Sequence, residues 1–266
     1  MARLLVCPPD HYGIDYEINP WMRVSNAADP ERSKAQWYDL MRTLEEDVGV
    51  ELERMTPIEG LPDLVFTANA GVTHDGKTVI SRFRHPERQG EEEHFERWFT
   101  EHNYSVIPLG GKIYFEGAGD LLGFPDTWFG GYRQRSDIAA YAVLSEIYGK
   151  EILPLELVND KFYHLDTCFC PLSGGELLYY PSAFDSYAQD AISNRIEEHR
   201  RLTVPQFEAE RFACNAVCVD RHVVLPSGCG ETMDLLKHHG YTTHPVKLDE
   251  FFKSGGSAKC LTLALD

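Results

Sequence analysis

Residues 63–70, DLVFTANA, begin the part of the sequence that decides the fold. This apolar run leads to a turn at Asp75-Gly76 and to a second short apolar run at 79–80. Residues 91–102 carry many charges, and their large apolar side chains lie three and four positions apart, as on one face of a helix: Phe95, Trp98 and Phe99. Another apolar run ends the unit at 106–109. The segment therefore predicts two strands, a helix and a third strand.

The same order recurs at intervals of about fifty residues. Apolar runs begin further units at 113–122, 162–171 and 213–219, and helices are predicted at 136–148, 188–200 and 232–239. The fifth unit is divided between the chain ends, with strands at 260–265 and 3–6 and a helix at 30–48. Glycine often ends a helix because it accepts the left-handed backbone, and three glycines stand at such places: Gly49, Gly149 and Gly240.

Five ββαβ units predict an α/β fold, a five-bladed α/β propeller with pseudo-fivefold symmetry. Its strands would face a central axis and its helices would form the rim. Residues 1–266 would then be a single catalytic domain of five repeats, closed through the termini. An ordinary α/β domain with a repetitive composition is the alternative.

Polar residues recur with the same period. They follow one another at intervals of 50, 47, 48, 51 and 45 residues: Asn19, Asn69, Glu116, His164, Asn215 and Cys260. Residues at matching places in successive blades would converge on one axis. The spacing therefore predicts a site that combines a thiol, an imidazole and a carboxylate.

The composition limits the partners. The chain has 266 residues, 43% of them hydrophobic, and a formal net charge of −17. This charge argues against nucleic acid and anionic membranes, and it suits a small cationic ligand, although acidity also serves solubility. The N-terminal apolar run is too short for a signal sequence, and no stretch approaches the length of a membrane span. Seven cysteines, an odd number, are typical of reduced thiols, so we expect a cytoplasmic protein.

Cys260 differs from the other cysteines in its surroundings. It follows a Gly/Ser-rich run at 254–259, which indicates a mobile loop that enters a strand. Four other cysteines lie in apolar strand segments, where a buried structural thiol is the common role: Cys168, Cys170, Cys214 and Cys218. Zinc is the alternative for these four, but Cys-x-Cys is not the usual ligand spacing.

The remaining polar residues suit a planar guanidinium. His164 and Asp166, two apart in a predicted strand, would share one face, and Glu116 and Asp120 lie in a glycine-rich segment. Carboxylates pair with the N–H groups of a guanidinium and would hold it flat while a thiolate attacks its central carbon. A histidine can protonate the departing amine and then activate water. This chemistry requires neither a metal nor a cofactor.

The sequence resembles the guanidino-modifying branch of the pentein superfamily, which includes arginine deiminases, dimethylarginine hydrolases, arginine dihydrolases and amidinotransferases. The matching segments stand in family order: FEGAGD at 115–120, GYRQRS at 131–136, HLD at 164–166 and GSAKCLT at 256–262. The resemblance implies that Cys260 is the nucleophile, His164 the general acid and base, and Glu116 its partner.

The resemblance also implies the substrate-binding residues, which are Asn19, Asn69, Arg88, Arg135, Asp120 and Asp166. Arg88 and Arg135 would bind the α-carboxylate of the substrate. Each arginine has rivals close by, because Arg82 and Arg84 precede Arg88 and Arg133 lies two residues before Arg135. The sequence leaves these alternatives open.

Asn69 favours one activity within this branch. Deiminases and dimethylarginine hydrolases carry an aspartate there, whereas FTANA at 66–70 and INPWM at 18–22 resemble arginine dihydrolases, which convert arginine to ornithine, carbon dioxide and two ammonia. An amide both donates and accepts hydrogen bonds, so it can hold a neutral ureido group for a second hydrolysis. The alternatives are a citrulline-forming hydrolase, an amidinotransferase and a binding protein of the pentein fold. Exposed helices around a ring would also permit a homo-oligomer.

Overall fold

A computed structural model describes residues 2–265, which contain five three-stranded β-sheets. In every sheet the middle strand pairs antiparallel with one neighbour and parallel with the other. The sheets, in strand order, are β15 (Leu263–Leu265), β1 (Arg3–Val6) and β2 (Glu51–Arg54); β3 (Gly71–His74), β4 (Lys77–Ile80) and β5 (Ser105–Ile107); β6 (Leu121–Gly123), β7 (Thr127–Tyr132) and β8 (Glu151–Glu156); β9 (Phe169–Pro171), β10 (Leu177–Tyr179) and β11 (Arg201–Thr203); β12 (Val217–Val219), β13 (His222–Pro226) and β14 (Thr242–Val246).

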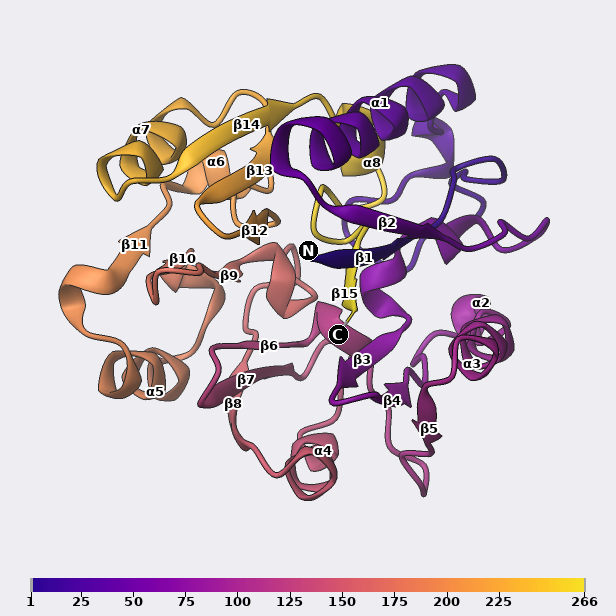
Figure 1. Ribbon diagram of the computed structural model, residues 1–266, viewed down its shortest axis with the longest axis horizontal. Helices are drawn as coiled ribbons and strands as arrows, with labels where there is room; N and C mark the ends of the chain where they lie inside the picture. The colour runs from indigo at the N-terminus through magenta and orange to yellow at the C-terminus, as the bar shows by residue number, and fades with distance from the viewer. Residues whose placement is uncertain (1, 266) are drawn as a thin grey trace.

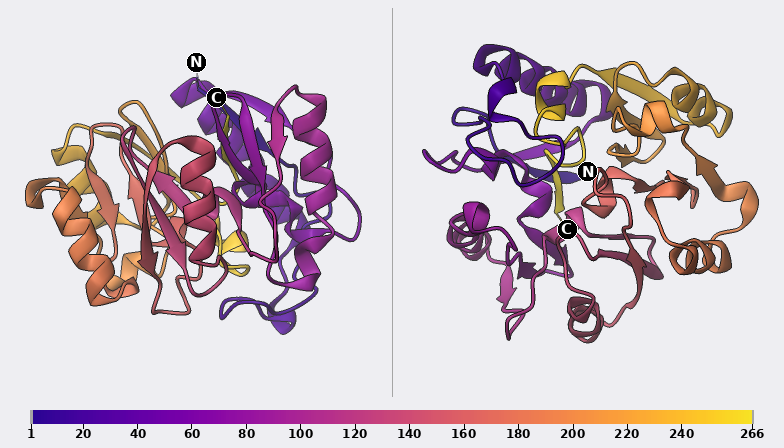
Figure 2. Two further views of the ribbon diagram at one scale, coloured as in Figure 1. Left: turned by 90° about the horizontal axis from the view of Figure 1, so that it is seen from below. Right: turned by 180° about the vertical axis from the view of Figure 1, so that it is seen from behind.

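In each sheet a helix connects the middle strand to the strand that pairs parallel with it, so the predicted ββαβ order is confirmed, with the first strand of one unit at the other end of the chain. These helices are α1 (Pro30–Arg42), α2 (Pro86–Gln89) with α3 (Glu92–Glu101), α4 (Ala139–Tyr148), α5 (Ser186–Arg195) and α7 (Gly230–His238). The short helices α6 (Gln206–Ala209) and α8 (Asp249–Phe252) lie in connections between sheets. The sheets surround the centre of the molecule and the longer helices lie outside them, in both the front and the rear view (Figures 1 and 2).

The first and last strands of the chain share a sheet. Leu4 of β1 pairs with Ala264 of β15 on one side and with Leu52 of β2 on the other. Strands β1 and β15 therefore both lie near the centre in Figure 1. The pairing places Cys260, which precedes β15, beside the sheet that begins the chain.

The predicted first strand of each unit is largely wrong. In the unit that begins at residue 63, the strand starts only after the predicted run, at Gly71, and in the other four units only the last two or three residues of the run form a strand. Turns of 3₁₀ helix occupy much of the predicted runs at Pro62–Val65, Thr67–Asn69, Gly117–Gly119 and Leu165–Thr167. Cys260 likewise lies in a turn, three residues before β15. Because these turns precede the first strands, the polar side chains that they carry lie beyond the start of each strand. In a continuous strand the same side chains would lie within the sheet.

Three helical segments end at or just before the glycines that were predicted to end them. Gly49 and Gly149 are left-handed caps, with φ of 82° and 64°, and Gly240 follows the cap of α7 with φ of 80°. The predicted helix at 30–48 is α1 continued by a π-helical segment at Thr43–Val48, and the one at 188–200 ends early, at Arg195.

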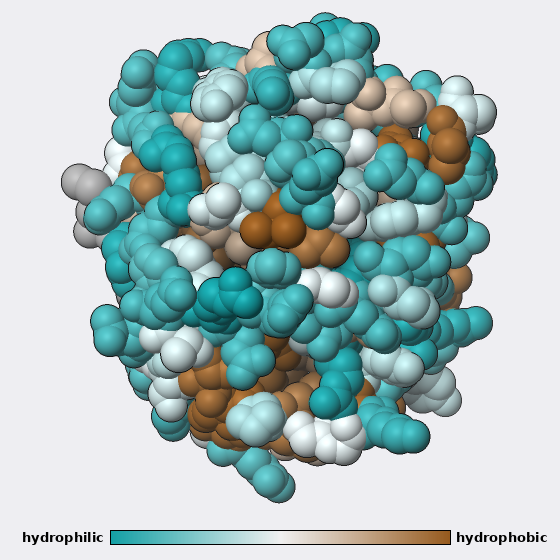
Figure 3. Space-filling model, turned by 90° about the vertical axis from the view of Figure 1, so that its right-hand side faces the viewer, coloured by the Kyte–Doolittle hydropathy of each residue, from teal (hydrophilic) through white to brown (hydrophobic). Residues whose placement is uncertain are grey.

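The apolar core is divided among the sheets. One cluster joins strands β7 to β13 with α5 and contains Cys168, Cys170 and Cys214. These three thiols are buried as predicted, and Cys218 packs against the same cluster, partly exposed. The face on the side of α2 and α3 is mostly hydrophilic, with apolar areas between the polar side chains (Figure 3). None of the helices within residues 2–265 is long and apolar enough to span a membrane.

Candidate active site

Five of the six periodic polar residues come just before the first strand of a sheet. Asn69 precedes β3, Glu116 precedes β6, His164 precedes β9, Asn215 precedes β12 and Cys260 precedes β15. All five are at most 3% exposed. The repeat therefore brings one polar residue from each sheet into the interior.

Glu116 and His164 form a direct contact. Glu116 Oε2 lies 2.7 Å from His164 Nε2 and accepts a hydrogen bond from Arg135 Nη1 at 2.9 Å, while Oε1 accepts the backbone N–H of Arg84. Burial alone would raise the pKa of Glu116, but Arg135 and His164 outweigh it and hold this pKa well below its usual range. Burial lowers the pKa of His164 to about 4 despite Glu116. At neutral pH the pair is a carboxylate and a neutral imidazole.

Cys260 faces a second carboxylate. Its Sγ lies 3.4 Å from Asp166 Oδ2, and it accepts a hydrogen bond from Asn215 Nδ2 at 3.1 Å. Burial, and then the charge of Asp166, raise the pKa of the Cys260 thiol well above its usual value. Burial also raises the pKa of Asp166, to about 6, although Lys259 opposes this shift. The sulfur is therefore a thiol at rest.

A small cavity of about 10 Å³ reaches Cys260, which is about the room that one water requires. It is lined by ten residues, which include predicted ones and others that were not predicted: Ile18, Asn19, Asp63, Phe66, Asn69, Arg88, Arg135, Tyr163, Ser254 and Cys260. Neither His164 nor Glu116 lines it directly. A ligand larger than water can enter only if part of this lining moves.

Asp63 is a lining residue that the sequence analysis missed. It is 3% exposed, its Oδ2 accepts a hydrogen bond from the Tyr16 hydroxyl, and its Oδ1 has no hydrogen-bond partner within residues 2–265. Burial raises the pKa of Asp63, while Arg88 and Tyr16 oppose the shift. An acid within a buried apolar run is the sequence signal, because burying a carboxylate without a partner is costly.

The structure distinguishes the competing arginines. Arg88 and Arg135 are each 3% exposed and line the cavity. Arg82 bonds to the backbone of Gly111, Arg84 to Asp137 and to the backbone of Arg135, and Arg133 to Glu156, all away from the cavity. Of these five arginines, Arg88 and Arg135 are therefore the two that reach the cavity, and their role toward a substrate stays a prediction.

The two selected arginines differ in how many donors they have left. Four N–H groups of Arg88 are used, two on the Glu91 carboxylate, one on Asn69 Oδ1 and one on the backbone of Asp63. Arg135 uses two, on Glu116 and on the carbonyl of Ile18. Since a guanidinium has five N–H donors, Arg135 keeps more of them for a ligand.

Asn69 is held in one orientation. Its Oδ1 accepts from Arg88 Nη1 at 2.9 Å, and its Nδ2 donates to the backbone carbonyl of Glu116 at 3.0 Å. A methyl group at Gly119 would lie 2.3 Å from this nitrogen, so glycine is required there. Within residues 2–265 the second N–H of Nδ2 has no acceptor, and Asn69 lines the cavity.

Two of the predicted placements differ from the structure. Asp120 does not line the cavity, because its Oδ2 accepts the Ser136 hydroxyl at 2.6 Å and its Oδ1 accepts the backbone N–H of Leu165 at 3.0 Å. It joins two loops instead of facing a substrate. His164 and Asp166 do not share a strand face either, since they flank the start of a 3₁₀ turn at Leu165. Asn19 lines the cavity and donates to the carbonyl of Ser254 at 3.0 Å.

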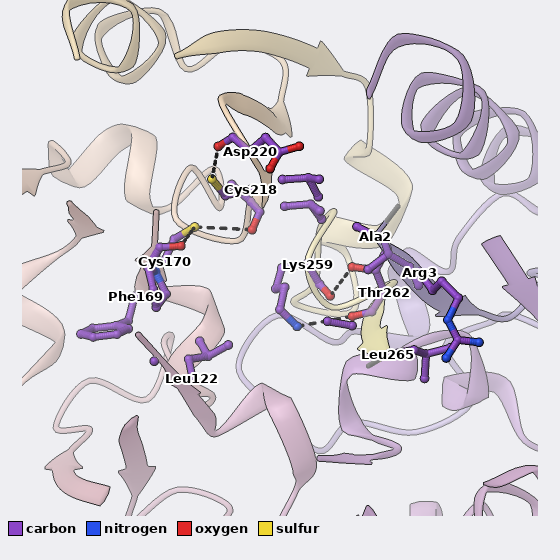
Figure 4. A pocket seen from close by; sticks show the side chains of 17 residues that line it. Ala2, Arg3, Leu122, Phe169, Cys170, Cys218, Asp220, Lys259, Thr262 and Leu265 are labelled. Atoms are coloured by element: carbon purple, nitrogen blue, oxygen red, sulfur yellow. Dashed lines mark hydrogen bonds between the residues drawn. The ribbon is translucent and has the colours of Figure 1, made fainter. Parts of the chain in front are cut away.

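A second, larger cavity of about 440 Å³ lies along the first strands (Figure 4). Its lining comes from β1, β6, β9, β12 and β15, whereas the periodic site residues precede the first strands of their sheets. Lys259 lines this cavity and Cys260 lines the other, although they are adjacent in the chain. The segment at 259–260 thus separates the two cavities.

The fold and this combination of thiol, imidazole and carboxylates define a member of the guanidino-modifying branch of the penteins. The family model of N,N dimethylarginine dimethylhydrolase, eukaryotic, matches residues 14–265, and the chain belongs to this family. Within residues 2–265, no three acidic, histidine or cysteine side chains are arranged as metal ligands.

The similar proteins include two named activities. The bifunctional arginine dihydrolase/ornithine cyclodeaminase ArgZ of Synechocystis sp. is 44% identical over 98% of this chain, which spans 37% of the length of ArgZ. The N(G),N(G)-dimethylarginine dimethylaminohydrolase of Mycobacterium tuberculosis is 36% identical over 99% of this chain and 85% of its own length. The solved N-terminal domain of ArgZ with bound substrate, a cyanobacterial arginine dihydrolase, superposes with a TM-score of 0.96, at 42% identity, over 99% of this chain and 98% of that domain.

Proposed function

We propose that the protein is an arginine dihydrolase, which converts arginine and two waters to ornithine, carbon dioxide and two ammonia. Asn69 is the observation that carries the proposal. The similarity to the substrate-bound domain of ArgZ supports it independently. The five sheets would be the blades of a closed five-bladed propeller, and the single domain would hold the site at its axis.

The head group of arginine fits the charges of the cavity lining. The free Oδ1 of Asp63 would accept from the substrate ammonium, and the spare N–H donors of Arg135 would hold the carboxylate. Arg88 would act mainly through Asn69, which it orients. Asn19 and the neighbouring Ile18 would have to move to admit the substrate, because the cavity is so small.

The guanidinium end would lie between Asp166 and Glu116, against Cys260. A cationic group there offsets the two carboxylates, so it favours loss of the thiol proton and attack of sulfur on the guanidinium carbon. His164, neutral at rest, would carry a proton to the departing ammonia and then take one from the water that hydrolyses the thiouronium. The product of this first round is citrulline.

Asn69 would make a second round possible. The ureido oxygen of citrulline needs a donor, and the second N–H of Asn69 Nδ2 has no acceptor within residues 2–265. Sulfur would attack the ureido carbon, ammonia would leave, and water would release the carbon as carbamate, which yields carbon dioxide and ornithine. An aspartate at this position can only accept, so it would favour release of citrulline.

The test is the product balance of the purified chain. We expect arginine to yield two ammonia per ornithine, with Cys260→Ala inactive as the control. Accumulation of citrulline alone, or no turnover of arginine, would refute the proposal. The family model favours N,N-dimethylarginine as the second candidate, and release of dimethylamine without turnover of arginine would support it. Cytoplasmic location, a homo-oligomer and the lack of nucleic-acid or membrane partners stay predictions.

A further inference from the structure

Asn215 has a periodic place in the sequence and contacts the reacting sulfur, yet the proposed function assigns it no role. It is fully buried just before β12. Its Nδ2 donates to Cys260 Sγ at 3.1 Å and to the backbone carbonyl of Asp166 at 3.1 Å. Its Oδ1 accepts the backbone N–H of Ser257 at 3.0 Å and that of Cys260 at 3.1 Å.

These four contacts use the full capacity of the side-chain amide, two donors and two acceptor sites. The amide orientation is certain, because a flipped group would turn its N–H donors toward two backbone N–H groups. A single side chain thus binds both the backbone and the sulfur of Cys260. The backbone carbonyl of Asn215 also accepts the N–H of Lys259 at 3.2 Å.

The contacts assign different partners to the sulfur in its two states. As a thiol, Cys260 can donate to Asp166 Oδ2 at 3.4 Å and accept from Asn215. As a thiolate, it can only accept, and Asp166 becomes a repulsive neighbour. Asn215 Nδ2 is then the side-chain donor in contact with the sulfur within residues 2–265.

We propose that Asn215 is a catalytic residue whose amide holds Cys260 Sγ in the orientation for attack and donates a hydrogen bond to the thiolate. The inference rests on the proposed role of Cys260 as nucleophile, but it requires no particular substrate. It differs from a purely structural role, in which Asn215 only fastens the loop at 257–260. The two roles predict different behaviour of the thiol.

Asn215→Asp separates these roles. Aspartate has the same shape and retains the acceptor for the backbone N–H groups of Ser257 and Cys260, but it loses the donors to sulfur and to the carbonyl of Asp166 and adds a negative charge beside the sulfur. Asn215→Leu removes the same donors without adding a charge, so the shift that both variants share measures the lost donor. Asn194→Asp is the matched control, since it makes the same change at an exposed position of α5. The readout is the rate of Cys260 alkylation by iodoacetamide against pH, with the labelled peptide identified by mass spectrometry.

We expect Asn215→Asp to shift the alkylation profile to higher pH by one unit or more. We also expect kcat on arginine to fall by roughly 10²- to 10³-fold, as when one donor to a developing charge is removed. KM should change little, because Asn215 does not line the cavity. A parent-like alkylation profile in a folded variant would overturn the proposal, whatever happens to kcat. A shifted profile without turnover of any guanidino compound would refute only the proposed function.

A measurement on the parent chain covers the case in which the variant does not fold. Asparagine labelled with ¹⁵N gives side-chain signals from seven residues. Asn19 and Asn69 line the cavity beside Cys260, so their signals are identified first, by substitution of each. The Asn215 signal is then the remaining one that moves when Cys260 is alkylated, and it should titrate with the same midpoint as the alkylation rate. Side-chain signals that all ignore both alkylation and titration would overturn the proposal.

Discussion

Replacing Asn69 by aspartate should stop the reaction at citrulline. The side chain cannot rotate away from the substitution, because Gly119 leaves no room beside Nδ2 and Arg88 holds Oδ1. The new carboxylate oxygen must therefore take the place of Nδ2, 3.0 Å from the carbonyl of Glu116. The hydrogen bond from Arg88 is kept and becomes an ion pair, because its acceptor is now a carboxylate.

The magnitude follows from the lost donor. A buried oxygen left without its hydrogen bond costs about 1–3 kcal/mol, and the ureido oxygen of citrulline would be in this position. Since about 1.4 kcal/mol is a tenfold change, kcat/KM for citrulline should fall roughly 5- to 150-fold. The cationic guanidinium of arginine would instead meet an additional acceptor, so the first round should continue.

The assay follows ornithine and citrulline over time, with arginine and then citrulline as substrate. We expect Asn69→Asp to accumulate citrulline from arginine, while the exposed control Asn194→Asp behaves like the parent. The reasoning is wrong if the variant retains the parental ratio of ornithine to citrulline. It is also wrong if a folded variant loses both rounds to the same extent.

Three further predictions concern charge and stability. The pKa of Asp166 is raised from its ordinary 3.8 to about 6, chiefly by burial. The folded state therefore holds this proton more tightly than the unfolded state, and the stability that the protonated group contributes is fully present below pH 3.8 and is lost as pH rises through 6. Asp166→Asn should therefore raise the unfolding free energy at pH 8 by about 3 kcal/mol and change it little near pH 4, measured by denaturant titration. The cation at 259 lowers the pKa of both Cys260 and Asp166, so it increases the fraction of Cys260 that is thiolate. Lys259→Met should therefore slow Cys260 alkylation at pH 8 by roughly five-fold, and an unchanged rate would count against this coupling. Glu208→Ala should destabilise the protein by about 1–2 kcal/mol in thermal unfolding but leave activity intact, since Glu208 accepts from the backbone N–H and the hydroxyl of Thr232 at the start of α7.

Repetition made much of the fold predictable. The second and third strands and the helices appear as contiguous apolar or amphipathic segments, and local pattern decides such elements. The first strands were misplaced or predicted too long because 63–70 and 162–171 are rich in residues that favour strands, although 3₁₀ turns occupy most of the first run and part of the second. In the run at 113–122, Gly117, with φ of 65° and no room for a Cβ, starts the turn that follows Glu116. Such close packing is a tertiary constraint, and local pattern does not contain it.

The predicted site residues also differ in how far sequence could place them. Regular spacing singled out Glu116, His164 and Cys260, and these occupy matching places in the structure. The sequence could not show that Asp120 lies away from the cavity. Only the structure shows that both of its carboxylate oxygens accept hydrogen bonds, from Ser136 and Leu165. Arginines two residues apart have the same chemistry, so only burial distinguishes them.

The pairing of β1 with β15 has a consequence for biosynthesis. The antiparallel partner of β1 is synthesised about 260 residues after β1 itself. Until then that edge of β1 has no partner strand, and Cys260 is added only three residues before the partner begins. A contact of such long sequence separation forms slowly, because closing a large loop costs entropy first. A chain not yet synthesised past residue 259, or cleaved before residue 260, would therefore lack both the nucleophile and a finished sheet, so reactivity would arise together with the folded state.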